Sequence, residues 1–456
     1  MMGVLESWRT RISERIKNFR HWEKLAAGAL IALAVYLFIH AERRAFRGDV
    51  SDFRAYYTAA AEMRAGRDPY APSERPYLYP PLLAFLCMPL TSFAMPVAAA
   101  IYLLVLVITM MLALRIAPTA MLQRFNPHPS TSTLSQATML LIPLMIDRLK
   151  SDVQMFQVNT IMLLMFTLGL HWLDRRPLLA GSALGFALNI KGQTIVMLPY
   201  LLLRRRWSAG GAMAASAVVL AVLPAAFTGW QANIKNLGTV MGGLRTFSGT
   251  HTEADAPTHL VDLTAGFSVS AISGLARVLK KAGLADWLWP LAGVLIVVVF
   301  VVVVCAYRRA GVPLLHWPPR VAQCFQPWQS TIALEWSLLI MATLVFSPQT
   351  NSRHFVLMLL PMAMGIAALL SPIAHRARMT MLAGVIVSYA ALVLPPGSHH
   401  LQRLYYWRGN WFYVGGPSWG LLAALVLFLF AGLRAVKARQ VTANPIEPSN
   451  HGFTWV

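Results

Sequence analysis

The sequence predicts an all-α, polytopic membrane protein. Of its 456 residues, 57% are hydrophobic and only 12% are charged, whereas soluble domains carry about 25% charged residues. The 39 lysines and arginines outnumber the 18 acids and form short clusters beside apolar segments. This is the positive-inside pattern of membrane proteins. A soluble enzyme is therefore disfavoured, membrane lipids are the expected surroundings, and no nucleic acid partner is expected.

The first 79 residues divide into three parts. Residues 1–24 are basic and amphipathic and lack the features of a cleavable signal peptide, so we expect a cytoplasmic helix at the membrane surface. Residues 25–40 are apolar and form the first predicted span. Residues 41–79 are polar and are predicted to form the first outer loop.

Two kinds of apolar segment follow the first loop. Some approach the length of about 20 residues that a spanning helix needs, and others are clearly shorter. Short or broken helices place polar ends at a buried site in transporters and membrane enzymes. We therefore expect about 10–12 membrane segments, some of them short or re-entrant. The longer segments are 96–116, 209–227, 287–307, 331–346, 355–370, 379–394 and 418–434, and the shorter ones are 79–92, 134–146, 160–172, 178–190 and 194–203.

The basic clusters assign a side to each connection. They predict a single membrane unit over residues 25–436 and a cytoplasmic tail over 437–456, with both termini cytoplasmic. No internal repeat supports a pseudo-symmetric transporter, and no G-x-x-x-G string stands in a context that predicts close helix packing. The predicted outer loops are 41–79, 228–286, 347–354 and 395–415.

The scarce acids concentrate in the first outer loop. Six of the 18 acids lie between residues 42 and 74. Asp52, Tyr56 and Ala59 follow helical spacing, and Asp49 begins a second series of the same kind. A carboxylate is therefore predicted at the start of a short helix at the membrane face. Either aspartate could act there as an ordinary N-cap, or as a base in a reaction.

Four ordered blocks resemble glycosyltransferase family 87. The first comprises D-F-x-x-Y-Y-x-A-A at 52–60, G-R-D-P-Y at 66–70 and Y-x-Y-P-P at 77–81. The second is Q-V-N-T-I-M-L-L at 157–164, the third is L-A-G-S-A-L-G-F-A-L-N-I-K at 179–191, and the fourth is S-P-Q-T-N-S-R-H at 347–354. Together the blocks keep the order that they have in the family, and this ordered set carries the resemblance.

The resemblance implies a GT-C type multispan helical bundle with its active site at the outer, periplasmic face of the bacterial inner (plasma) membrane. It implies a polyprenyl-phosphate sugar donor, commonly a mannosyl donor, and a lipid or glycan acceptor. It assigns the role of general base to Asp52, with Asp49 as the alternative. Some members carry two adjacent histidines where this chain has Arg353 and His354, so only His354 matches.

The reaction requires a base for the acceptor hydroxyl and cations for the leaving phosphate. Lys191, Arg353 and His354 are predicted to bind the donor phosphate, although Lys191 could instead snorkel from a helix end and His354 could be a helix cap. Tyr79 could instead belong to an interfacial aromatic belt. Gln157 and Asn159 could instead be helix caps without a role in binding. The predicted substrate-binding residues are Tyr56, Tyr57, Tyr79, Gln157 and Asn159.

Alternative functions and cofactors also follow from the pattern. A transporter or flippase for a lipid-linked or anionic substrate would place ionisable residues near the middle of its spans, whereas here they lie in outer loops and at helix ends. An assembly protein without activity is the third alternative.

The histidines and acids at 251–262 do not fit a standard zinc pattern. We expect no metal site and no cofactor, and the sequence leaves a divalent metal open.

Overall fold

The computed structural model describes residues 21–47, 51–71, 76–248, 262–312, 314, 325–348, 350–394 and 409–443. In these ranges the chain is helical, and the only extended pairing is an isolated bridge between Ser268 and Asn351. Eight helices in the described ranges are long and apolar enough to cross a membrane, and four further apolar helices are shorter. The prediction of an all-α polytopic membrane protein is confirmed.

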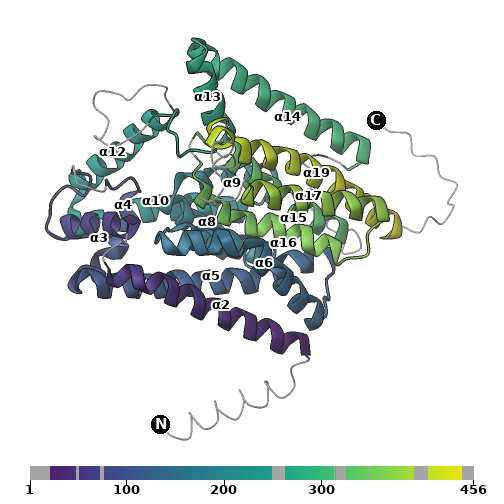
Figure 1. Ribbon diagram of the computed structural model, residues 1–456, viewed down its shortest axis with the longest axis horizontal. Coiled ribbons are helices and arrows are strands. Elements are labelled where there is room, and N and C mark those ends of the chain that lie inside the picture. Colours follow the sequence, from purple (N-terminus) through teal and green to yellow (C-terminus); the bar gives the residue numbers. More distant parts are fainter. Residues whose placement is uncertain are drawn as a thin grey trace, which may run out of the picture.

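The first part of the described chain contains a 14-residue helix that follows the first long helix and lies at one end of the bundle (Figure 1). This helix, α3, occupies the predicted first outer loop. The bounds are α2 (His21–Phe46), α3 (Ser51–Arg64), α4 (Pro81–Cys87), η1 (Met88–Ser92), α5 (Met95–Phe125) and α6 (Thr131–Gln154).

The middle part contains three of the predicted short segments, 160–172, 178–190 and 194–203. Their polar ends fall at the turns between helices, where the sequence places them. The bounds are α7 (Asn159–Trp172), α8 (Pro177–Ile190), η2 (Gly192–Val196), α9 (Met197–Leu203), α10 (Trp207–Val222), α11 (Ala225–Thr228) and α12 (Trp230–Ser248).

The last part supplies the centre of the bundle. Every residue of α16 from Leu359 to Ala368 is buried, whereas α14 exposes a face of valine, isoleucine and phenylalanine side chains. Such an exposed apolar face is suited to lipid. The bounds are α13 (Ala271–Lys281), η3 (Ala285–Trp287), α14 (Leu288–Ala310), α15 (Phe325–Phe346), η5 (Ser352–Met358), α16 (Leu359–Leu369), α17 (His375–Val393) and α19 (Gly416–Ala443).

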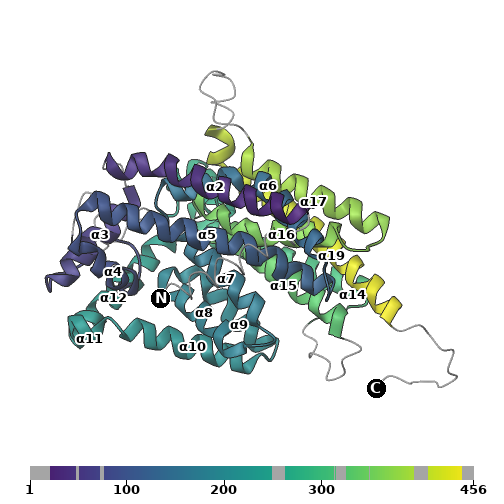
Figure 2. The same ribbon diagram turned by 90° about the horizontal axis from the view of Figure 1, so that it is seen from below.

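The long helices run side by side, and α3, α4 and α12 gather at one end. In Figure 1, α2, α5, α6, α15, α17 and α19 lie roughly along the long axis, while α3, α4 and α12 lie together at the left. The view turned by 90° keeps α3, α4 and α12 at that end and places α7 to α10 along one edge (Figure 2). The bundle therefore has two distinguishable ends.

The expectation about G-x-x-x-G is wrong. Gly181 and Gly185 form such a string on α8, and this face packs directly against α10. A Cβ at Gly181 would overlap the backbone oxygen of Ala209, and one at Gly185 would overlap the hydroxyl of Ser216. Small residues four apart allow this close approach of two membrane helices.

Other boundaries differ from the sequence expectation. Helix α6 continues through Asp147, Arg148 and Lys150 to Gln154, because helical hydrogen bonding does not stop where hydropathy falls. The predicted outer loop 228–286 contains α12 and α13. The predicted helix at residues 1–20, the reserve base Asp49 and the last residues of the tail lie outside the described residues.

Candidate active site

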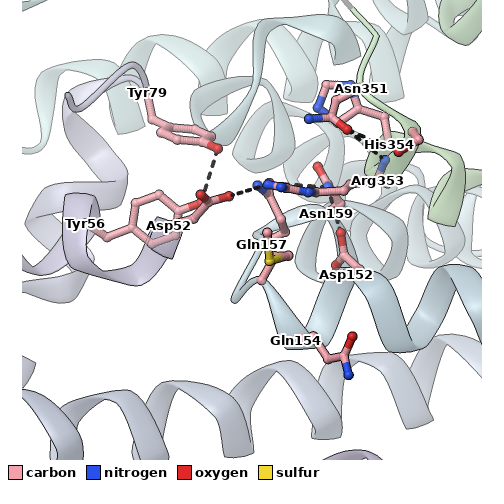
Figure 3. Close-up of polar contacts among 12 residues, drawn as sticks. Asp52, Tyr56, Tyr79, Asp152, Gln154, Gln157, Asn159, Asn351, Arg353 and His354 are labelled. Carbon is pink, nitrogen blue, oxygen red and sulfur yellow. Dashed lines mark hydrogen bonds and ion pairs between the residues drawn. The ribbon is translucent and has the colours of Figure 1, made fainter. Parts of the chain in front are cut away.

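Asp52 lies in the first turn of α3 and faces Arg353. The Arg353 Nη1 atom is 3.4 Å from Asp52 Oδ2, and the two side chains are 24% and 23% exposed. Figure 3 shows the arginine reaching across from η5 toward the carboxylate. A pair this long and this open leaves room for another group to bind either partner.

The backbone of η5 is held in place before Arg353 by a cap and a bridge. The Asn351 side chain accepts a hydrogen bond from the Arg353 backbone N–H. The bridge is the pairing of Ser268 with Asn351, next to which the Val269 N–H donates to the carbonyl of Thr350 at 2.7 Å. These contacts tie η5 to the segment before α13 and fix the start of the helix that carries Arg353 and His354.

A strained turn joins α6 to α7 beside the site. Phe156 is buried and adopts a left-handed conformation with φ 57°, which is uncommon for a bulky residue. The turn carries Gln157 and Asn159 back toward the end of α6. As a result, Asn159 Nδ2 donates to Asp152 Oδ1 at 2.7 Å and lies 3.4 Å from Gln157 Oε1.

Lys191 occupies the connection between α8 and η2 and joins several elements. Its Nζ donates to Asn159 Oδ1 at 2.7 Å and lies 2.9 Å from His354 Nε2. The same ammonium lies 5.5 Å from the centre of the Tyr79 ring. Burial lowers the pKa of Lys191, and the carboxylates of Asp152 and Asp52 act against this shift.

The contact with Lys191 defines the protonation of His354. A protonated lysine only donates, so His354 Nε2 accepts and the ring proton lies on Nδ1. That atom is 3.5 Å from the side-chain nitrogen of Gln193, and Gln193 Oε1 has no partner in the described part of the chain. Exchanging the amide oxygen and nitrogen of Gln193 gives Nδ1–H an acceptor, an assignment that follows from the hydrogen-bond network.

Tyrosines form the wall between α3 and Lys191. The Tyr56 hydroxyl donates to the Tyr79 hydroxyl at 3.1 Å, and the two rings meet edge to face. Burial and, next, the charge of Asp52 raise the pKa of Tyr79, so its phenol stays neutral. Tyr57 differs, because its hydroxyl donates to the backbone of Phe93 and takes no part in this wall.

We call the polar side chains gathered here the site cluster. It includes most of the residues that the sequence singled out, with Tyr56, Tyr79 and Gln157 against it, while Tyr57 lies apart. Sequence reasoning missed Asp152 and Gln193, whose only signal is their closeness to Asn159 and Lys191 along the chain. The site cluster is Asp52, Asp152, Asn159, Lys191, Arg353 and His354.

The site cluster combines two carboxylates with two cations. Asp52 is open enough to accept a proton from a bound hydroxyl, and Arg353 and Lys191 are suited to an anionic group. Among the residues that the structure describes, no three histidine, cysteine, aspartate or glutamate side chains lie close enough to hold a metal ion.

Comparison with known proteins identifies the family. The family model described as Glycosyltransferase family 87 matches residues 77–322, which is more than half of the chain. This match includes Asp152, Asn159 and Lys191 and excludes Asp52, Arg353 and His354. No curated protein matches the chain. With its multispan helical fold, the chain belongs to glycosyltransferase family 87 and is a multi-pass membrane glycosyltransferase.

Proposed function

We propose that the enzyme transfers a hexosyl group, with mannose as the first candidate, from a polyprenyl-phosphate donor to a hydroxyl of a lipid or glycan acceptor. Asp52 is the general base. The observation that carries the proposal is the pairing of a half-buried carboxylate, Asp52, with Arg353 in the site cluster. Lys191 stands on the other side of the same cluster.

The proposed step is an inverting displacement. The acceptor oxygen forms a bond to C1 of the sugar while the bond between C1 and the phosphate oxygen breaks. The acceptor proton passes to the Asp52 carboxylate. The electron pair of the broken bond stays on the phosphate, which leaves as a polyprenyl phosphate and gains one negative charge.

The Asp52–Arg353 pair couples the two halves of this step. When Asp52 takes the proton it becomes neutral, and Arg353 loses the charge that held it at 3.4 Å. At the same time the leaving phosphate becomes more negative. Arg353 therefore exchanges one anion for the other as the bond breaks, which stabilises charge where it develops. Lys191 stabilises the negative charge on the oxygen atoms of the same phosphate.

The distribution of basic residues supports an active site on the outer, periplasmic face. Arg175 and Arg176 follow α7, and Arg308 and Arg309 end α14. Arg204 at the end of α9 lies at the same end of the bundle as Tyr307, because both contact Glu335. The site cluster lies at the other ends of α7 and α8. The positive-inside rule then assigns the basic end to the cytoplasm and the site cluster to the outer face of a bacterial inner membrane.

The test is a transfer assay in proteoliposomes with radiolabelled polyprenyl-phosphate mannose and a lipid extract as acceptor. We expect Asp52→Asn to lower the rate by about 10²–10⁴-fold. The matched control is Glu62→Gln, which changes a surface acid of α3 that pairs with Arg67 and is expected to keep full activity.

Three results would overturn parts of the proposal. Unchanged transfer by Asp52→Asn would remove Asp52 as the base. Failure of the wild type to transfer mannose, combined with transfer from the glucosyl counterpart, would correct the sugar. Failure with both donors would reject polyprenyl-phosphate sugars as the donor class.

A further inference from the structure

Asp152 is a buried acid that the proposed step does not use. Its side chain is fully buried, and Oδ1 accepts from Asn159 at 2.7 Å. Oδ2 has no hydrogen-bond partner in the described ranges. A buried carboxylate is unfavourable unless a positive charge compensates for it, so a compensating group is expected nearby.

The compensating charge is Lys191, reached through Asn159. The amide of Asn159 donates with its nitrogen to Asp152 and accepts with its oxygen from Lys191 at 2.7 Å. The carboxylate therefore fixes the direction of the amide, and the amide fixes the ammonium. Lys191 then contacts His354 at 2.9 Å, which completes a line of four side chains from α6 to η5.

We propose that Asp152 is a positioning residue for the transfer, which keeps Lys191 charged and directs its ammonium toward the donor phosphate. This inference rests on the proposed function. Asp152 does not touch the substrate, because it is fully buried. It acts through Asn159 and Lys191.

The charges around Lys191 explain why a second carboxylate is needed. Asp152 approaches from α6, Asp52 from α3, and Arg353 and His354 from η5, with the neutral Tyr79 ring against the ammonium. Asp52 is neutralised when it takes the acceptor proton. Asp152 takes no proton from the acceptor in the proposed step, because its buried side chain reaches Lys191 only through Asn159. Its carboxylate therefore remains beside Lys191 when Asp52 becomes neutral.

The first test is Asp152→Asn, which keeps an oxygen for Asn159 and removes only the charge. We expect the KM for the donor to rise about tenfold with a smaller change in kcat. Loss of the carboxylate makes Lys191 easier to deprotonate, so the alkaline limb of kcat/KM should move about one pH unit lower. Asp147→Asn, at an exposed position of the same helix, is the matched control and should leave both quantities unchanged.

The second test is Asp152→Asn combined with Lys191→Arg. A guanidinium stays charged across the pH range, so the alkaline shift should disappear in this double variant. A purely structural role for Asp152 would lower the amount of folded enzyme without moving the pH limb. A wild-type donor KM and pH profile in Asp152→Asn would overturn the inference, whereas a wild-type enzyme without transfer activity would reject the proposed function.

A double-mutant cycle keeps the inference testable if Asp152→Asn does not fold. Asp152→Asn with Lys191→Met removes both charges and leaves no buried cation without its compensating carboxylate. We expect this protein to fold and to have the activity of Lys191→Met alone, because Asp152 acts through Lys191. An additional loss beyond Lys191→Met would contradict the inference.

Discussion

The two ends of α7 and α8 carry polar clusters of opposite character. At one end is the site cluster, where Asp52 and Arg353 are about a quarter exposed and 3.4 Å apart. At the other end is a set that we call the arginine cluster, where the Arg204 side chain is only 3% exposed. The arginine cluster is Arg124, Asp174, Arg204, Arg206 and Glu335.

The charged groups of the arginine cluster pair with one another and with neighbouring tyrosines. Arg204 binds Glu335 through two nitrogens, with Nε at 2.9 Å, and Glu335 also accepts from Tyr200 at 3.1 Å and Tyr307 at 2.9 Å. Asp174 is shared by Arg124 and Arg206. Similar residue types thus form a structural lock at one end and the more open candidate site at the other, and the difference lies in the deep burial of the Arg204–Glu335 pair.

The largest effect that separates the clusters is expected from Arg204→Gln. It leaves the buried Glu335 carboxylate without its charge partner, and breaking such a pair costs about 3–5 kcal/mol. The measurement is the thermal unfolding midpoint in mild detergent. Arg376→Gln, at an exposed position, should stay within about 0.5 kcal/mol of the wild type. A wild-type midpoint for Arg204→Gln would mean that the arginine cluster is not a lock.

Arg353→Gln should give the reverse pattern. The transfer rate is expected to fall by about 10²–10³-fold, because a cation at the leaving phosphate is lost. The unfolding midpoint should change little, since the pair with Asp52 is long and partly exposed. Arg64→Gln, which removes a surface arginine bonded to Thr91 and Ser92, is the activity control. A fall in stability without a fall in rate would reverse the assignment of the two ends.

The smallest effect concerns α8, which connects both clusters. Gly181→Ala adds a methyl group against the α10 backbone, and overpacking of this kind costs about 1–3 kcal/mol. Gly211→Ala on α10 places the methyl group in open space and should not destabilise the protein. Equal unfolding midpoints for the two variants would show that α8 and α10 can separate without cost.

Hydropathy and the family blocks together predict most of the architecture and many residues of the site. The alternation of apolar and basic segments predicts the spans. The helical spacing of Asp52 and Tyr56 predicts a carboxylate at the start of a short helix. The site assignments of Asp52, Lys191, Arg353 and His354 remain predictions that the geometry accommodates.

The remainder depends on tertiary packing. Asp152 is one of two acids beyond the apolar part of α6, and only the left-handed turn at Phe156 returns Asn159 to it. Tyr57 shares a motif with Tyr56 but points about 100° away around the helix, toward Phe93. Gly181 and Gly185 acquire their role from α10, a partner that local sequence does not specify.

The order of synthesis gives the site cluster a sequence of assembly. The contact between Asp152 and Asn159 joins residues only 7 apart, so it can form while the ribosome is still translating the first half of the chain. The contacts from Lys191 to His354 and from Asp52 to Arg353 join residues 163 and 301 apart. They must wait until η5 has emerged, because distant contacts form only after the intervening chain exists. The site cluster is therefore complete only after most of the helices have been synthesised, and under the proposed function this would make activity depend on completed insertion.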